Sequence, residues 1–413
     1  MVFNKNTPPH RIIIILFVLF AMFIVNSIFN SLSSLFYKRK ETPDLLPNCI
    51  VTLGLKNAIH FSFENQKEKT LKFVSQMQTS NEFEYKYSPS NKVPSIYNSV
   101  YACMILSMYG EIKKMDTLTK KKWISYFDSF QDPNTGFFVD DRIVNKNWKT
   151  INWWGAKHLC PQVISVYTAF GAKPKHEFIW VKKYYDINLL QSLLDTCDWD
   201  SAIPDENDID NEIMNLGAIL QYQRDFFNDQ QAGKAVVFLK DYLKSKINAS
   251  TGMWGGYNVN DKAELARMIQ FSYHLFRIFF YDNEALINEK KLIDLILKSQ
   301  SSNGGWGMKI NSSACEDIDA IDILIYASNR TDYRKEDIKK AITLSLIFIL
   351  ANQNEDGGFV FRRDEPFTYG TSVMSSGRNE SAMFPTWFRS LCIAYMCNFL
   401  GIANYDIVHC PGY

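Results

Sequence analysis

Residues 299–308, SQSSNGGWGM, are the stretch of sequence that decides the fold. A polar residue such as glutamine, a short turn containing glycine and then an aromatic residue follow directly after a segment with helical periodicity. The same order returns at residues 130–138 (FQDPNTGFF), 247–256 (INASTGMWGG) and 352–361 (NQNEDGGFVF). A motif that recurs in this way indicates a chain built from structural repeats.

The glycines of these turns measure the length of the repeat. Gly252, Gly304 and Gly357 are 52 and 53 residues apart, whereas Gly136 precedes Gly252 by 116 residues, which corresponds to two steps. Degenerate copies at residues 188–199 and 74–83 stand at the two remaining places. We therefore expect six units of about 55 residues from roughly residue 60 to residue 402.

Each unit is predicted to contain two helices of different character. The helix before the turn is amphipathic, as at residues 290–300, where three lysines and an aspartate line one face. The helix after the turn is apolar almost all round, as at residues 263–280 and 381–400, which indicates burial on every side. These features predict an all-α fold, an (α/α)6 toroid of six helix-pair repeats, although the same pairs could stack as an open solenoid.

The residues of the turn are expected to be structural. Glycine adopts a positive φ at little steric cost, which suits the end of a helix and a tight reversal. The glutamine can satisfy backbone groups left unpaired at the helix end, and the aromatic ring can pack against neighbouring helices.

The N-terminal segment is predicted to anchor the protein in a membrane. Residues 12–29 are almost wholly apolar and uncharged, and about 18 residues of helix just cross a hydrocarbon core of about 30 Å. A cleaved signal peptide and a buried core helix are the alternatives. We expect a single-pass membrane protein with an anchor over residues 1–37, a linker over 38–58 and the toroid domain over 59–413. Basic residues on both sides of the span leave its orientation open.

Composition excludes several classes of partner and site. The 45 Lys and Arg residues nearly balance the 44 Asp and Glu residues, so the chain has no broad basic field for nucleic acid. The eight cysteines include no C-x-x-C pair, which argues against a zinc ribbon or a redox motif and favours buried free thiols. We expect no metal and no cofactor.

The repeat resembles a known motif. The segment from Gln300 to Trp306 fits the Q-x(2–5)-G-x-W repeat of squalene and oxidosqualene cyclases, and the segments beginning at Gln131 and Gln353 fit it with Phe in place of Trp. The chain is thus similar to the terpenoid cyclase and protein prenyltransferase superfamily, which has an α/α-toroid fold. The same resemblance is shared with unrelated toroid proteins that process glycans.

Acidic residues are concentrated after the best copy of the turn, at residues 315–322 (CEDIDAID). The resemblance maps the D-x-D-D acid motif of class II terpene cyclases onto residues 317–320 and implies that Asp319 is the proton donor, although Ala320 replaces the last Asp. We take Asp317, Asp319 and Asp322 as the candidate catalytic residues. The alternative is that Asp317 and Glu316 only cap a helix N-terminus.

Zinc-dependent prenyl transfer is disfavoured by the same segment. The β subunits of protein prenyltransferases bind zinc through Asp, Cys and His. Here Cys315 precedes the acids, and the histidine expected further along the chain is absent.

Further candidates lie where the inner helices are expected to begin, because those ends meet at one rim of a toroid. The candidate substrate-binding residues are Trp153, Trp154, His158, Asp210, Glu212, Asn215, Glu380, Trp387 and Arg389. His158 and His274 are also typical of hydrogen-bonded core residues, and Glu380 and Arg389 can be interpreted as an ion pair.

Three functions remain open from the sequence. The first is an enzyme that acts on an isoprenoid or other lipid by Asp-mediated acid catalysis. The second is a glycan-processing (α/α)6-barrel enzyme with paired carboxylates. The third is a non-catalytic scaffold that binds partners or lipid.

Overall fold

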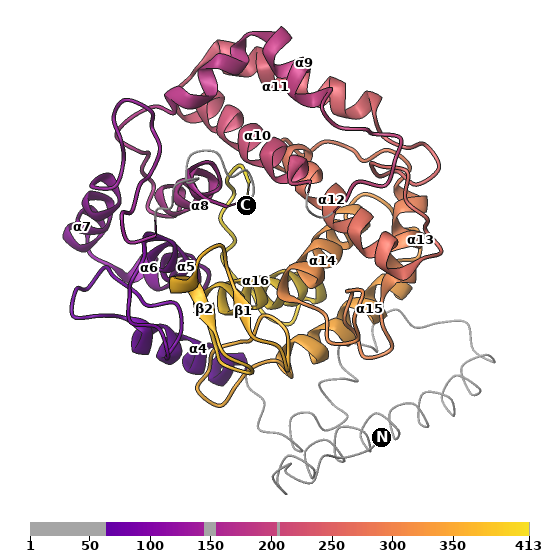
Figure 1. Cartoon of the computed structure of the whole chain (residues 1–413). Coiled ribbons are helices and arrows are strands. Elements are labelled where there is room, and N and C mark those ends of the chain that lie inside the picture. Colours follow the sequence, from indigo (N-terminus) through magenta and orange to yellow (C-terminus); the bar gives the residue numbers. More distant parts are fainter. Residues whose placement is uncertain (1–62, 144–153, 205–206, 413) are drawn as a thin grey trace, which may run out of the picture. The chain divides into compact units, whose positions relative to one another are not determined.

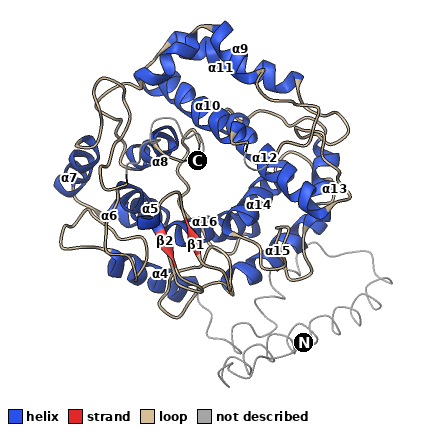
Figure 2. Cartoon of the chain, viewed as in Figure 1, coloured by secondary structure: helices blue, strands red, loops and turns tan. Residues whose placement is uncertain are grey.

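The computed structural model describes residues 63–143, 154–204 and 207–412, which lie in one compact unit, Phe61–Tyr413. Helices dominate it (Figures 1 and 2). Their bounds in chain order are α4 Phe63–Met77, α5 Ile96–Met108, α6 Glu111–Lys114, α7 Thr117–Asp128, α8 Ala156–Ala169, the 3-10 helix Ile179–Tyr185, α9 Ile187–Leu194, α10 Ile209–Phe226, α11 Gln230–Ser245, α12 Lys262–Tyr281, α13 Glu289–Ser299, α14 Ala314–Ser328, α15 Lys335–Leu350 and α16 Met383–Leu400. Two short antiparallel strands, β1 Phe367–Thr368 and β2 Ser375–Ser376, flank the 3-10 turn Ser372–Met374.

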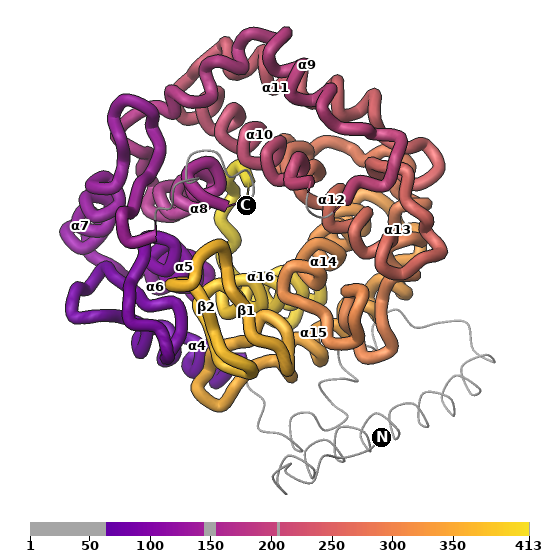
Figure 3. Tube along the Cα trace, viewed as in Figure 1, coloured from indigo at the N-terminus to yellow at the C-terminus, as the bar shows by residue number. Residues whose placement is uncertain are grey.

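The helices form two concentric rings. Within the described residues, α5, α8, α10, α12, α14 and α16 make the inner ring, and each packs against the next. The ring is closed because α16 also packs against α5, and Figure 3 shows this C-terminal helix beside the N-terminal part of the unit. The outer positions are taken by α4, α7, α9, α11, α13 and α15. The predicted α/α toroid is therefore confirmed, and an open solenoid is excluded.

Burial follows the predicted difference between the two kinds of helix. Along α14 and α16 almost every side chain is buried, since each lies between two inner neighbours and an outer helix. In α13 one face is buried, whereas Lys290, Lys291 and Lys298 are exposed. The unit with the degenerate turn has the shortest outer helix, the eight residues of α9, which follows a 3-10 helix.

The repeated turns join neighbouring units. The Nε2 atom of Gln300 donates to the carbonyl oxygen of Gly304 in its own turn and to that of Ala341 in α15, at 3.3 and 2.9 Å. Gln353 makes the corresponding contacts to Gly357 and to the hydroxyl of Thr70 in α4, at 2.9 and 3.1 Å. The glutamine thus binds the next outer helix as well as its own turn, and the last turn binds the first helix.

The turn glycines have the positive φ that the sequence predicts. At Gly304 φ is +99°, and at Gly357 it is +94°. A Cβ atom at Gly357 would collide with the backbone of Lys69 in α4. Glycine is therefore required there both for backbone conformation and for close approach.

Two other expectations concern the N-terminal segment and the cysteines. The predicted anchor at residues 12–29, the linker and their boundaries lie outside the described residues. In the part of the chain that is described, none of the helices has the length and apolar character needed to cross a membrane. The seven cysteines in that part are free thiols, and six are buried, as expected.

Replacing Gly357 by Ala should weaken ring closure. We expect Gly357→Ala to lower the free energy of unfolding by about 3 kcal/mol, because strain at positive φ adds to the collision with Lys69. The control is Gly401→Ala, at the C-terminus of α16, where φ is +66° but no atom lies within 4 Å of the added Cβ. Thermal and denaturant unfolding of both variants measure the difference. Equal losses would mean that the approach of the turn to α4 is not tight.

Candidate active site

Several of the functional candidates lie on the inner helices and interact with one another. Each inner helix follows an outer helix in the chain, and each inner helix packs against the next. We use the name central cluster for Tyr97 and Tyr101 of α5, His158 of α8, Asp210 of α10, Arg267 and His274 of α12, Asp319 of α14, Phe384 and Trp387 of α16, and Tyr369 of the segment between β1 and β2. Hydrogen bonds, ion pairs and ring contacts link most of these side chains, as described below.

Asp319 is the unpaired acid of the cluster. Its side chain is 2% exposed, and its Oδ2 atom has no hydrogen-bond partner among the described residues. Burial raises the pKa of Asp319 well above its ordinary value, and the carboxylates of Glu316 and Asp210 raise it further. The charge of Arg267 acts in the opposite direction but is the smaller effect. The protonated acid is thus favoured at this position.

Asp317 is held in a structural ion pair. Its Oδ2 atom accepts a hydrogen bond from Arg389 at 2.9 Å, and both side chains are fully buried. Its Oδ1 atom accepts from the backbone N–H of Trp306 and from the hydroxyl of Ser312. The remaining guanidinium hydrogens bind the carbonyl oxygens of Ser312, Val360 and Phe361. This pair therefore ties α14 to α16 and leaves no free oxygen for chemistry.

The other acids of residues 315–322 are also engaged. Glu316 forms a capping box with Ser313 at the start of α14, so the helix-cap interpretation is correct for this residue. Asp322 pairs with Arg277 of α12 at 2.5 Å and accepts a hydrogen bond from Tyr273 at 3.1 Å. Of the three predicted catalytic acids, Asp319 alone lacks a charged partner among the described residues.

Asp210 is the ionised acid of the cluster. It is fully buried and accepts hydrogen bonds from His274 Nδ1 at 2.9 Å and from Arg267 at 3.1 Å. Burial by itself raises the pKa of Asp210, but the bonds and charges of His274 and Arg267 outweigh it and hold the pKa below the ordinary value. Two carboxyl groups that affect one another thus have pKa values shifted in opposite directions.

His158 is a neutral, fully bonded histidine. Its Nδ1 atom lies 3.0 Å from the hydroxyl of Tyr97 and its Nε2 atom 3.3 Å from that of Tyr369. Burial lowers the pKa of His158 to about 3, and the charge of His274 contributes. The ring therefore stays uncharged at neutral pH and connects α5 to the segment between β1 and β2.

Aromatic rings make up the rest of the cluster. Trp154 stacks on Tyr97 with 5.4 Å between ring centroids, and Trp387 stacks on Tyr101 at 5.2 Å. Tyr369 stacks on Phe384 at 4.1 Å. Trp154 precedes α8, and the other rings belong to α5, α16 and the segment that carries Tyr369, so stacking links these parts of the inner ring.

Four predicted substrate-binding residues lie elsewhere or form other contacts. Glu212 pairs with Lys157 at 2.7 Å and joins α10 to α8. Glu380 accepts hydrogen bonds from Ser90 and Gly377, so its expected pairing with Arg389 is wrong. Asn215 is buried within α10, and Trp153 lies outside the described residues.

The sequence did not single out several members of the cluster. Arg267 and the tyrosines 97, 101 and 369 carry no motif, and His274 resembled an ordinary core histidine.

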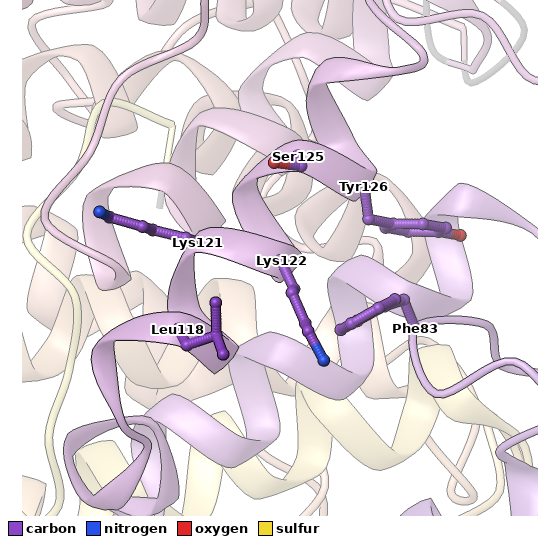
Figure 4. A pocket seen from close by; sticks show the side chains of 6 residues that line it. All are labelled: Phe83, Leu118, Lys121, Lys122, Ser125 and Tyr126. Carbon is purple, nitrogen blue, oxygen red and sulfur yellow. The ribbon is translucent and has the colours of Figure 1, made fainter.

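Two surface hollows of the described residues lie away from this cluster. One, shown in Figure 4, is a shallow depression over α7 lined by Phe83, Leu118, Lys121, Lys122, Ser125 and Tyr126. It contains no acid. No group of three or more metal-binding side chains occurs in the described ranges.

Comparison with known proteins identifies the family. The model of the prenyltransferase alpha-alpha toroid domain matches residues 25–156 and 217–367, and the chain belongs to this family. It is a toroid protein of the prenyltransferase and terpenoid cyclase superfamily. No curated protein matches the chain.

Two solved structures are similar in part. A point mutant of unsaturated glucuronyl hydrolase from Streptococcus agalactiae is 11% identical, with 84% of this chain and 92% of that chain covered and a TM-score of 0.47. A possible member of the GH105 family from Salmonella enterica serovar Paratyphi A is 10% identical, with 83% and 96% covered and a TM-score of 0.38. Neither similarity bears on the reaction of this protein.

Replacing each of the two neighbouring acids of α14 by asparagine should change stability in opposite directions. Asp317→Asn leaves Arg389 charged and buried, and we expect it to lower the free energy of unfolding by about 3–5 kcal/mol. Asp319→Asn removes a carboxyl group without a partner and should raise stability at neutral pH.

The gain from Asp319→Asn should depend on pH. Because the folded-state pKa of Asp319 is raised, its contribution to stability is complete below the unfolded-state pKa and is lost as pH rises through the folded-state pKa. The asparagine does not titrate, so its advantage should grow between about pH 5 and about pH 8. Unfolding curves at these two values measure it, and a constant difference would mean that Asp319 is not perturbed.

Proposed function

We propose that the protein converts an isoprenoid lipid by acid catalysis inside the toroid, with Asp319 as the proton donor. The observation that carries this proposal is the buried carboxyl group of Asp319, whose Oδ2 atom lacks a hydrogen-bond partner among the described residues and whose pKa is raised by burial. An unpaired buried acid destabilises a fold, so its presence is typical of a functional site.

The surroundings of Asp319 suit a reaction through carbocations. Protonating an alkene or an epoxide requires an acid that keeps its proton at neutral pH, and burial provides it. The cation that forms needs electron density without a strong nucleophile. The faces of Tyr101, Phe384 and Trp387 supply a negative quadrupole of this kind.

A glycan-processing reaction is the second candidate. In its favour, the pKa values of Asp319 and Asp210 are shifted in opposite directions, as in an acid and base pair. Against it, sugar sites use exposed aromatic rings as platforms for the sugar. Trp154 and Trp387 are only 0% and 3% exposed. We therefore favour the lipid substrate. A pure scaffold would gain nothing from an unpaired acid in its interior.

Turnover should depend on Asp319. We expect Asp319→Asn to lower the rate by about 10²–10⁴-fold, because the amide has no proton to donate. The substrates to offer are geranylgeranyl diphosphate, squalene and oligosaccharides, with products identified by mass spectrometry. Asp332→Asn, at a side chain that is 92% exposed, is the matched control and should keep full activity. Undiminished turnover by Asp319→Asn would remove this residue from the mechanism, and turnover of oligosaccharides alone would favour the second candidate.

We also propose that residues 12–29 anchor the protein in the membrane from which a lipid substrate would enter. The support is the length of this apolar, uncharged stretch. The full chain should sediment with membranes and resist extraction by salt, and a variant lacking residues 1–37 should become soluble with its toroid folded. Extraction of the full chain by salt or carbonate would contradict a spanning anchor.

A further inference from the structure

The segment that follows α16, residues 401–412, has no part in the acid step. It forms neither helix nor strand. Its first half is attached to the C-terminal ends of two inner helices. Asn398, in the last turn of α16, exchanges two hydrogen bonds with the backbone of Tyr405, at 2.8 and 3.1 Å. The backbone N–H of Asp406 donates to the carbonyl oxygen of Met108, the last residue of α5, at 3.3 Å.

The second half of the segment reaches two further inner helices. The ring of His409 stacks on that of Tyr281, the last residue of α12, with 4.8 Å between centroids. The hydroxyl of Thr168, near the end of α8, donates to the Sγ atom of Cys410 at 3.4 Å. The C-terminal ends of α5, α8, α12 and α16 therefore all contact one short stretch of chain.

The last described residues of the segment lie between inner helices. A Cβ atom at Gly412 would lie 3.0 Å from the Cβ of Ala218 in α10 and 3.1 Å from the Cβ of Pro161 in α8. Both positions are in the middle of their helices, and Figure 3 shows the segment inside the ring near α8 and α10. Pro161 follows His158 by three residues, which is about one helical turn. The segment thus extends from the helix ends to about one turn from the central cluster.

This stretch of chain fills space within the ring. Cys410 and Pro411 are buried, and Cys410 is 1% exposed. Because protein interiors are closely packed, a ligand could lie against Pro161 and Ala218 only if residues 410–412 moved out. These two side chains are apolar, so the space that would be uncovered suits the hydrocarbon part of a lipid.

The two halves of the segment are attached with different strength. Residues 401–406 have the hydrogen bonds to α5 and α16, and Asp406 also pairs with Lys113 of α6 at 2.8 Å. Residues 407–412 make no backbone–backbone hydrogen bond within the described part of the chain, and a thiol is a weak partner for Thr168. Stretches with few hydrogen bonds open at a low cost in free energy while the rest of the protein stays folded.

We propose that residues 401–412 form a displaceable plug, which fills the ring interior beside α8 and α10 and moves out to admit a substrate. The inference goes beyond the acid step, since it concerns access to the interior and not the chemistry. Opening of the plug can be measured without a substrate. Only its effect on turnover rests on the proposed function.

Two cysteines of the native protein report whether the plug opens. Cys410 lies in the plug and Cys160 in α8, both are at most 1% exposed, and burial raises the pKa of each thiol to about 12. Their intrinsic reactivity is thus matched, but Cys160 becomes accessible only when its helix unfolds. In the native full-length protein, iodoacetamide should modify Cys410 at least about 10²-fold faster than Cys160, as measured by peptide mass spectrometry. Equal rates would overturn the proposal.

Weakening the attachment of the plug should speed its opening. Asn398→Ala removes both hydrogen bonds to Tyr405 and should raise the modification rate of Cys410 by about 10-fold without changing that of Cys160. Asn404→Ala, at an exposed side chain of the same segment, is the matched control and should leave both rates unchanged. An equal rise at both cysteines would mean that the whole fold loosens, which contradicts a local opening.

A reversible lock tests whether opening serves turnover. Thr168→Cys places a second thiol beside Cys410, and mild oxidation of this variant should form a disulfide between the two positions. The lock should stop modification of Cys410 and lower turnover of the accepted lipid by at least about 10-fold, and a reductant should restore both. Thr168→Ser, treated with the same oxidant, is the control and should keep full turnover.

Failure of this inference differs from failure of the proposed function. If the locked variant keeps native turnover while Asp319→Asn is inactive, the plug does not control access and the acid step stands. If Asp319→Asn is active, the proposed function is lost, and the modification rates of Cys410 and Cys160 still decide whether the plug opens.

Discussion

Closure of the inner ring is the constraint on which the structure depends. The inner helices are apolar on almost every side, and an isolated one would expose most of that surface to water. Each becomes fully covered only when it lies between two others, and the first and last achieve this through contact of α16 with α5. The outer ring is closed in the same way, because Gln353 in the last turn donates a hydrogen bond to Thr70 of the first outer helix, α4.

Closure also determines where charge can be placed. The N-terminal halves of the inner helices meet in an interior from which water is largely excluded, so a carboxylate there is costly unless it is paired. Asp317 is paired with Arg389 and Asp322 with Arg277, and these pairs connect neighbouring inner helices. Burial raises the pKa of all three carboxyl groups, and Asp319 differs from the other two because it has no charged partner among the described residues.

The repeat could be predicted from sequence because its signals are local. The polar residue and glycine of the four clear turns and the change from amphipathic to apolar helices lie within about 50 residues of one another, so six helix pairs could be predicted from the pattern. The resemblance to cyclases also placed Asp319 at the proton-donor position. Only the structure shows that the Oδ2 atom of Asp319 lacks a hydrogen-bond partner among the described residues.

The partners of the charged residues could not be predicted, because they depend on which helices become neighbours. Arg389 bonds to Asp317, 72 positions earlier, instead of to nearby Glu380. His274 resembled a core residue because Asp210, its partner, precedes it by 64 positions on another helix. Tyr369 belongs to a segment without helical periodicity, so nothing in its own surroundings indicated that it reaches His158.

The protonation state of Asp319 at neutral pH is the property from which the account of this site follows. Infrared difference spectroscopy between the native protein and Asp319→Asn measures it directly, because a protonated carboxyl group in an apolar site has a carbonyl band distinct from the carboxylate bands. The account predicts that this band is present in the native protein at neutral pH, shifts in D₂O and is absent from the variant. A native spectrum with only carboxylate bands lost on substitution would show that Asp319 is ionised and would contradict the account.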